Sequence, residues 1–372
     1  MLVSEYRCYE FVALDRPLRS KQMAELRASS TRAEITPTRF WNEYQWGDLK
    51  ADPAKLVARY FDAHMYFASS GTHRLMLRVP VKRVDAKALP AYFVGDAAHA
   101  KLAGEHLILD LHSDDEEPDY DEESQGSLGA LVPLRAELMR GDLRPAYLAW
   151  LLAVQTDDLA ETDVEPPVPP GLSELSAAQA AMVEFLRIDV DLLAAAAMAS
   201  ARDEDDSAPL RAWALALPSR AKDAWLARAI DDLDLALGAE MRRAFRSETK
   251  SSPRPARRVA ELRAVANELR EKRERVERLA KEKAKRAAAA AKKKRLDALT
   301  QRLDSAWREL EALVDKKEYD AAMKLAIDLR DLAKRDGSAA PFAKPFEAMR
   351  KRQLRRRGFF DRWKRENEPD RW

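Results

Sequence analysis

The chain has 372 residues, of which 46% are hydrophobic and 34% charged, so it can bury real cores and is not a disordered protein. Its single cysteine, Cys8, excludes an internal disulfide and a cysteine-based zinc site. There is no basic and apolar leader and no apolar run of membrane-spanning length, which predicts a cytoplasmic protein without a membrane partner.

The net charge of +2 conceals two halves of opposite sign. From Ser251 onward there are 36 basic and 21 acidic residues, whereas the first 250 residues carry 29 basic and 42 acidic. In the simplest interpretation the halves solubilise the protein and partly neutralise each other. In the functional interpretation the basic half meets an acidic partner such as nucleic acid.

Residues 1–125 mix strand and helix patterns and predict an α+β domain with a small mixed sheet. Expected strands are YRCYEFVALD, two short strands within RAEITPTRFWNEYQWG, THRLMLRVP, and a hairpin in HAKLAGEHLILDLH that turns near Gly104. Expected helices are KQMAELRASS after Ser20 and AKLVARYFDAHMYFA, residues 54–68.

Three segments follow before the basic half. Carboxylates crowd residues 113–126 and predict a solvated acidic loop, since their spacing lacks the pattern of a calcium loop. Residues 127–247 predict a helical domain, a bundle of five or six helices. The rigid connector EPPVPPG interrupts it, because no helix can continue through these prolines. Its expected core residues are Trp150, Phe185, Trp213 and Trp225. Residues 248–258 predict a Ser/Pro/Arg hinge.

Residues 259–295 predict one long charged helix, because they consist of strong helix formers without Gly or Pro. Five acidic residues stand four positions before a basic one, as Glu282 does before Arg286, and each pair contributes about 0.2–0.5 kcal/mol. The apolar seam is broken at Arg273 and Lys283. These features favour a solvent-exposed strut, with a dimeric coiled coil as the alternative.

Residues 296–372 predict a helical hairpin followed by a basic tail. The apolar seam recovers between Leu296 and Val314, so a homodimer or docking contact is expected at 296–314, where Trp307 needs a partner. The hairpin, with its turn near Lys316-Lys317, is similar to one tetratricopeptide-type unit. A last short basic helix is expected to follow Gly337.

Five blocks together resemble a widespread family of uncharacterised bacterial proteins: YEFVALDRPL, ITPTRFWNEYQWGD, EPPVPPGL, FLRIDVDLLAAA and YDAAMKLAIDLRDLAKRDG. Some members of that family accompany SWIM zinc-finger proteins. The resemblance implies a multi-protein setting, with a SWIM zinc-finger protein as one expected partner. It implies no catalytic residues, and the ending LRRRGFFDRW is more arginine-rich than is usual in the family.

Motifs for common enzyme chemistry are missing, since the sequence has no GxxxxGK[ST], GxGxxG, GxSxG or HExxH. The best catalytic candidates are Asp110 and His112, which alternate onto one face of the strand HLILDLH and can supply metal ligands. They are weak candidates, because a polar outer face of a sheet has the same pattern. Cys8 and His64 are expected to be structural, His64 on a helix.

The sequence therefore predicts a non-enzymatic adaptor or scaffold without a cofactor or metal, in which the long helix holds partner-binding surfaces apart. Partner-binding candidates are Phe359, Phe360, Trp363 and Trp307 as apolar anchors and Arg355, Arg356 and Arg357 for an acidic partner. One alternative is a nucleic-acid-binding protein that uses the basic half. Another is a metal-dependent nuclease or phosphoesterase that uses Asp110 and His112.

Overall fold

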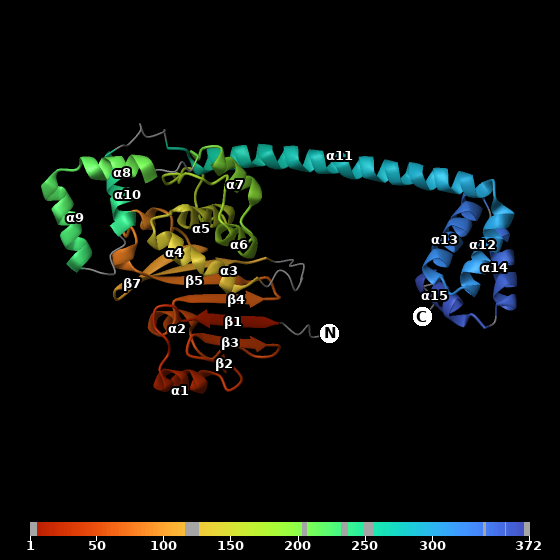
Figure 1. Ribbon diagram of the computed structural model, residues 1–372, viewed down its shortest axis with the longest axis horizontal. Coiled ribbons are helices and arrows are strands. Elements are labelled where there is room, and N and C mark those ends of the chain that lie inside the picture. The colour runs from red at the N-terminus through yellow and green to blue at the C-terminus, as the bar shows by residue number, and fades with distance from the viewer. Residues whose placement is uncertain are drawn as a thin grey trace. The chain divides into compact units, whose positions relative to one another are not determined.

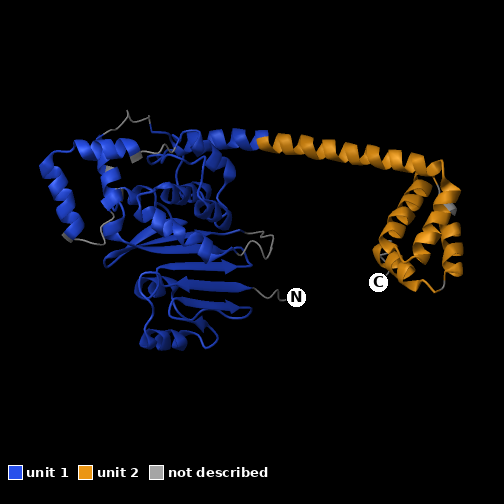
Figure 2. Cartoon of the chain, in the orientation of Figure 1, with its two compact units in different colours: residues 1–272 blue, residues 273–372 orange. Residues whose placement is uncertain are grey.

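The computed structural model describes residues 6–115, 126–202, 207–231, 237–248, 256–337, 340–353 and 355–367. The chain forms two units, residues 1–272 and 273–372, and each unit has its own hydrophobic core (Figure 2). A sheet comes first and helices follow it, so the predicted α+β class is confirmed (Figure 1). One long helix, α11 (Val259–Thr300), contributes residues to both units.

Unit 1 is built on a seven-stranded sheet with the order β2-β3-β1-β4-β5-β7-β6. The strands are β1 (Arg7–Val12), β2 (Glu34–Ile35), β3 (Arg39–Tyr44), β4 (Ala63–Ala68), β5 (His73–Pro80), β6 (Ala98–Ala103) and β7 (His106–Ser113). All neighbouring strands pair antiparallel, so the prediction of a mixed sheet is wrong. The hairpin of β6 and β7 turns at Gly104 as predicted, with a positive φ of 62° that glycine adopts freely.

The predicted helix over residues 54–68 is wrong in its second half. Helix α2 (Pro53–Arg59) ends early, and β4 follows it. Strand β4 pairs with β1 on one side and with β5 on the other, and Asp62, just before it, forms an ion pair with Arg78 at 2.7 Å. Two ladders of tertiary pairing outweigh the local helical pattern.

Five helices share one core on one face of the sheet, and the last of them packs on the third (Figure 1). They are α3 (Leu128–Leu131), α4 (Pro133–Met139), α5 (Arg144–Gln155), α6 (Ala177–Phe185) and α7 (Val190–Ala197). Trp150 and Phe185 lie in the core, as predicted, together with Met65 and Leu109 of the sheet. These helices therefore share one core with the sheet and do not form a separate bundle. Every residue of α5 from Pro145 to Val154 is buried, which requires neighbours on all sides.

The other face of the sheet carries a second core. Helix α1 (Ser20–Ser29) and α2 cover it, with Leu26 and Val57 among their buried residues. The Phe11 ring of β1 packs against Phe40 at 5.6 Å and Phe61 at 5.2 Å between ring centroids. Aromatic pairs at these separations stabilise beyond the area that they bury.

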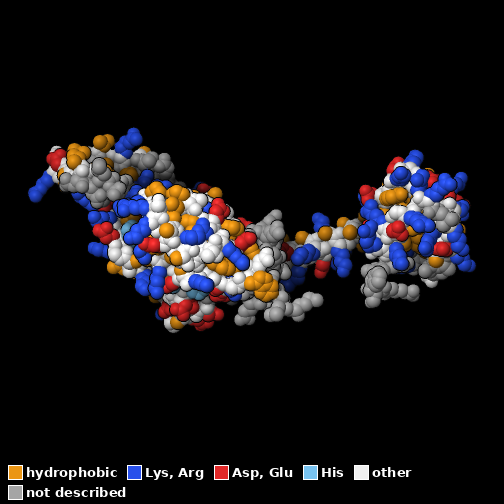
Figure 3. Space-filling view, turned by 90° about the horizontal axis from the view of Figure 1, so that it is seen from below, with side chains coloured by type: hydrophobic (Ala, Val, Ile, Leu, Met, Phe, Trp, Pro, Cys, Tyr) orange, Lys and Arg blue, Asp and Glu red, His pale blue; other side chains and the backbone are white. Residues whose placement is uncertain are grey.

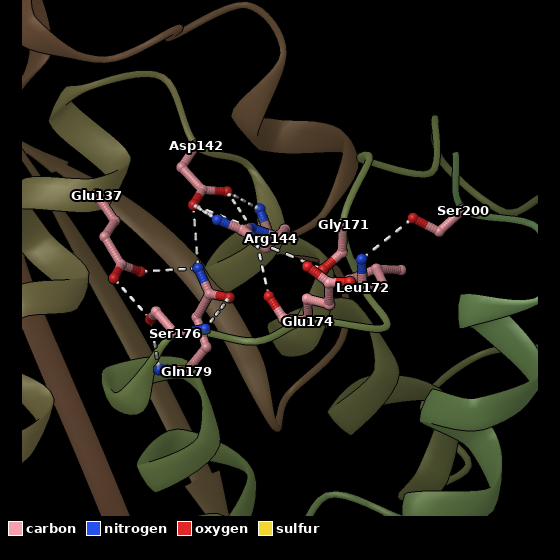
Figure 4. A network of polar contacts seen from close by, with 9 residues as sticks. All are labelled: Glu137, Asp142, Arg144, Gly171, Leu172, Glu174, Ser176, Gln179 and Ser200. Carbon is pink, nitrogen blue, oxygen red and sulfur yellow. Dashed lines mark hydrogen bonds and ion pairs between the residues drawn. The ribbon is translucent and has the colours of Figure 1, made fainter. Parts of the chain in front are cut away.

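A polar network joins the turn between α4 and α5 to the start of α6 (Figure 4). The Gln179 amide donates to Glu137 at 2.8 Å and to Asp142 at 3.0 Å, and the Ser176 hydroxyl donates to Glu137 at 2.7 Å. Arg144 donates to Asp142 at 2.7 Å. Because the buried Glu137 and the partly buried Asp142 receive hydrogen bonds from the chain itself, the network has a structural role. It fixes the segment after the proline-rich connector.

The last helices of unit 1 before α11 are loosely packed. They are α8 (Ser207–Ala216), α9 (Ser219–Asp231) and α10 (Leu237–Glu248), and none of their described side chains is buried. Trp213 lies 5.8 Å from Phe245 between ring centroids, and Trp225 is half-buried. The prediction that Trp213 and Trp225 are core residues is thus wrong, because these helices are too few and too short to enclose them.

Unit 2 contains the end of α11 and four more helices. They are α12 (Leu303–Asp315), α13 (Tyr319–Arg335), α14 (Ala340–Arg352) and α15 (Arg357–Asn367). The predicted hairpin of α12 and α13 is present, and Lys317 adopts a positive φ of 61° at its turn. The final basic segment forms two helices where one was predicted. The break lets Trp363 of α15 pack on Phe342 and Phe346 of α14, at 5.5 and 4.9 Å, which one straight helix could not do.

Two predicted segments lie largely outside the described residues: the acidic loop at 113–126, of which 116–125 is not described, and the hinge at 248–258, of which 249–255 is not described. The long helix ends at Thr300, beyond its predicted end at residue 295. Among the helices that the structure describes, none has the length and apolar character needed to cross a membrane.

Candidate interaction surfaces

A buried ion pair fastens the start of α11 to unit 1. Arg257 donates from Nε and Nη2 to the Glu165 carboxylate at 2.8 and 2.7 Å, and the Tyr147 hydroxyl donates to the same carboxylate. Burial acts to lower the pKa of Arg257, but its hydrogen bonds to Glu165 outweigh burial and raise that pKa. Burial and the Glu165 charge raise the pKa of Tyr147. The raised pKa values keep the Arg257 guanidinium charged and the Tyr147 phenol neutral, so each donates a hydrogen bond to Glu165.

Two further arginines continue this attachment along α11. Arg263 donates to the Val154 carbonyl oxygen at 2.7 Å and to Asp157 at 2.6 Å, and Arg270 pairs with Asp189. They are seven residues apart, which places them on the same side of the helix. The apolar residues of this first part of α11 pack in unit 1: Val259, Leu262 and Ala266 lie in its core, and Val265 and Leu269 are partly buried against it.

The next part of α11 is exposed at every position from Glu271 to Arg295. Val276 and Leu279, which continue the apolar seam, are 66% and 57% exposed. The predicted pair of Glu282 and Arg286 forms at 3.9 Å. Exposed pairs of this kind contribute only a few tenths of a kcal/mol each, so this span is a solvated helix.

The predicted apolar anchors of unit 2 mostly lie inside it. Phe359 is 0% and Trp363 is 7% exposed, and both belong to the core, while Trp307 and Phe360 are half-buried against it. Their rings are already occupied, so Phe359 and Trp363 are not presented to a partner. Sequence reasoning placed them on the surface because it treated the tail as one helix with an unpaired apolar face.

The seam at 296–314 is also used within the chain. Leu296, Leu299, Leu310 and Val314 are buried in the unit 2 core, and α12 packs on α13. Leu303, at 40% exposure, faces solvent. The apolar residues of the seam therefore pack within unit 2. They leave little apolar surface for the predicted homodimer contact.

The three predicted arginines differ in their surroundings. Arg356 donates to the Asp315 carbonyl oxygen at 3.0 Å and lies 3.8 Å from the Asp315 carboxylate. Arg355 and Arg357 are exposed, and neither forms an ion pair with any residue that the structure describes. Only these two of the three are free to meet an acidic partner.

Helices α8 and α9 expose large apolar side chains. Leu215 is 70%, Leu226 62% and Ile230 69% exposed. Leu226 and Ile230 are four residues apart, which places them side by side on α9. Figure 3 shows some hydrophobic side chains, interspersed with charged ones, on the lobe at its left end. Clustered exposed side chains of this kind are typical of an interaction surface.

The catalytic candidates Asp110 and His112 lie on β7. Asp110 is 4% exposed and accepts two hydrogen bonds from Arg74 of β5, at 2.8 and 2.6 Å, which raise the pKa of Arg74. His99 of β6 lies 3.6 Å from the same carboxylate. His112 is paired across the ladder with Arg74. The Asp110 carboxylate is therefore committed to an internal cation, as in a structural ion pair.

A metal site needs several ligands within reach of one ion. In the part of the chain that the structure describes, no three His, Cys, Asp or Glu side chains are grouped so that they could hold one. The hypothesis of a metal-dependent nuclease or phosphoesterase therefore has no ligand set among those residues.

Cys8 and His64 are both buried. Cys8 is 1% exposed on β1, in accordance with the expected structural thiol. His64 lies on β4, not on a helix as predicted, with its ring 3.9 Å from that of Phe11 and its Nδ1 2.9 Å from the Glu10 carbonyl oxygen. Complete burial lowers its pKa to about 3. The imidazole is thus neutral at physiological pH.

His64 should make unit 1 sensitive to mild acid. The unfolded chain binds a proton at this histidine below about pH 6.5, whereas the folded chain does so only near pH 3, so stability falls as the pH falls through this window. Between pH 6.5 and 5 we expect a loss of about 2 kcal/mol from this group. Urea unfolding of the wild type and of His64→Asn at several pH values measures this loss. The unfolding free energy of the variant should depend less on pH between about 6.5 and 5. Equal pH dependence of the two proteins would contradict the role of His64.

Comparisons with protein-family models, with curated proteins and with solved structures found no match to this chain. The resemblance to a bacterial family, and with it the SWIM zinc-finger partner, therefore stays a prediction from the sequence. Any functional proposal for the chain consequently rests on its own fold and contacts.

Sequence reasoning missed the attachment of α11. Glu165 and Arg257 are far apart in the chain, and neither lies in a recognisable motif. The seven-residue spacing of Arg263 and Arg270 beside the apolar seam was the one signal that this stretch of helix packs against a body.

Proposed function

We propose that the protein is a non-enzymatic adaptor in which α11 joins two separately folded units, each with a surface for a partner. The observation that supports this most directly is the exposure of α11 from Glu271 to Arg295. A span that buries no apolar surface adds almost nothing to either core, so its contribution is connection. Arg257, Arg263 and Arg270 fix its first turns, and Leu296 begins its burial in unit 2.

The partner surface of unit 1 in this proposal is formed by Leu215, Leu226 and Ile230. Two exposed basic residues lie one helical turn from these side chains: Arg211 stands four residues before Leu215, and Lys222 stands four residues before Leu226 and donates to the Leu215 carbonyl oxygen at 2.7 Å. The exposed Asp223 is the one carboxylate beside them on this part of α9. An apolar surface with a basic rim fits a protein segment that carries apolar side chains flanked by carboxylates. Burial of three such side chains is worth several kcal/mol, enough to contribute strongly to a stable complex.

This surface is tested by affinity capture from the native host with the double variant Leu226→Arg, Ile230→Arg. The matched control is Val276→Arg, Leu279→Arg, which adds the same charges at an equally exposed apolar pair on α11. Proteins retained by the wild type should be lost from the first variant and kept by the second. Retention of the same proteins by both variants would overturn the assignment.

Breaking the exposed span should leave both units folded. Ala289→Pro removes a hydrogen bond and clashes with the preceding turn, at a local cost of about 3 kcal/mol or more. Because residue 289 contacts neither core, we expect less than about 0.5 kcal/mol of change in the unfolding free energy of each unit. Differential scanning calorimetry checks this, with Ala289→Leu as a helix-compatible control, and a lowered transition in either unit would contradict it.

A further inference from the structure

The part of α11 that belongs to unit 2 carries a row of cations on one side. Lys283, Arg286, Lys293 and Lys294 are all exposed, and at 100° per residue they fall within about 100° of one another around the helix. We call these four residues the cationic face. They extend over about 16 Å of the helix axis.

The opposite side of the same helix is occupied by unit 2 itself. Lys292 pairs with Asp331 and Arg295 with Asp328, both on α13 and both at 2.6 Å. Leu296 enters the core on this side as well. The basic stretch 283–295 is thus divided between cations that hold the helix to α13 and cations that point away from it.

The cationic face has little compensating negative charge beside it on the helix. The sequence from 283 to 296 has no acidic residue, and among the residues that the structure describes the face forms one ion pair, the 3.9 Å contact of Arg286 with Glu282. The next acidic residue of the helix, Asp297, stands three and four positions after Lys294 and Lys293 and is engaged by Arg335 at 2.6 Å. Figure 3 shows Lys and Arg side chains over much of unit 2.

The residues between the cations are small. Apart from the cations, this part of the helix carries mostly alanine: Ala284 and the five alanines from Ala287 to Ala291. Its backbone can therefore approach a flat or grooved surface closely. A helix of this diameter enters the major groove of B-form DNA, which is about 12 Å wide, with its cations toward the phosphates.

We propose that the cationic face binds the phosphate backbone of double-stranded nucleic acid. A linear row of largely uncompensated cations on a smooth helix matches a regular array of phosphates. The face consists of cations and has no Asn, Gln, Ser or Thr, so the proposal assigns its contacts to the phosphates, which carry no sequence information. Binding to single strands is disfavoured, because it uses aromatic stacking and the Phe342, Phe346, Phe359 and Trp363 rings lie in the core.

This inference names the ligand class of one surface of the proposed adaptor, but the binding itself requires no protein partner. The test uses the purified full chain and fluorescence anisotropy of 20-base-pair duplexes, one of DNA and one of RNA with the same sequence. Four phosphate contacts give a slope of about −3.6 in log affinity against log salt, or about a 150-fold loss between 50 and 200 mM. The more tightly bound duplex identifies the source of the phosphates.

The variant replaces all four residues of the cationic face with glutamine, which preserves helix propensity. Its control replaces four exposed lysines elsewhere in unit 2, Lys316, Lys324, Lys344 and Lys351, and so changes net charge equally. We expect at least a 30-fold loss of affinity at 50 mM salt for the first and less than threefold for the control. Equal losses, no binding at 50 mM salt, or equally effective competition by polyglutamate would overturn the proposal. None of these results decides whether unit 1 captures proteins, so failure of this proposal can be told apart from failure of the adaptor proposal.

Discussion

Replacing Glu165 with alanine is expected to destabilise unit 1 by about 3–5 kcal/mol, since it removes one partner of a buried ion pair. The Arg257 side chain is 18% exposed and would keep its hydrogen bond to the Ala195 carbonyl oxygen, at 3.2 Å, but lose its carboxylate partner, while the Tyr147 hydroxyl would lose its acceptor. In a unit of this size the midpoint of thermal unfolding should fall by about 10 °C. Calorimetry measures it, and the transition of unit 2 should not move.

The matched control for this variant removes the charge that is left behind. In Glu165→Ala with Arg257→Met, no unpaired guanidinium remains, so the double variant should be more stable than Glu165→Ala alone. If the two substitutions instead destabilise unit 1 additively, then the pair contributes little and α11 is attached chiefly through its buried apolar residues.

Replacing Phe359 with alanine should destabilise unit 2 by about 3–5 kcal/mol, because the ring is completely buried in that core. In a unit of this size such a change lowers the midpoint of thermal unfolding by more than about 10 °C and leaves unit 1 unaffected. A partner anchor on the surface would behave differently, since its removal changes stability by less than about 0.5 kcal/mol.

The neighbouring ring supplies the comparison for Phe359. Phe360 is half-buried and contacts Phe346 at 5.6 Å between ring centroids, so Phe360→Ala should cost clearly less. The same calorimetry decides the order of the two variants. Equal small effects would place both rings at the surface and make both candidates for partner anchors again.

The fold could be predicted where the local pattern was unambiguous. Alternation identified β5 and β7, and Gly104 identified the turn before β7. It failed at β4, whose residues from Ala63 to Ala68 are buried or nearly so on both faces and therefore do not alternate. The long apolar run of α5 indicated burial on all sides, which is the mark of a helix between a sheet and other helices.

The surfaces were harder to predict than the fold. The apolar pairs Phe342 with Phe346 and Phe359 with Trp363 are each four residues apart, which identifies two helix faces but not that they pack on each other. Likewise, the row of Lys283, Arg286 and Lys293 can be read from the sequence, whereas the side of α11 that α13 covers cannot. That choice depends on Asp328 and Asp331, whose partners only the tertiary structure reveals.

The adaptor proposal is tested most directly by asking whether one molecule of the protein bridges two partners. Immobilised duplex is incubated with extract of the native host that has been depleted of its own nucleic acid without nuclease, together with the wild-type chain or with a variant. We expect the wild type to recruit extract proteins to the duplex, and both Leu226→Arg, Ile230→Arg and the fourfold glutamine variant of the cationic face to fail to do so. Equal recruitment by the wild type and the Leu226→Arg, Ile230→Arg variant would contradict the proposal.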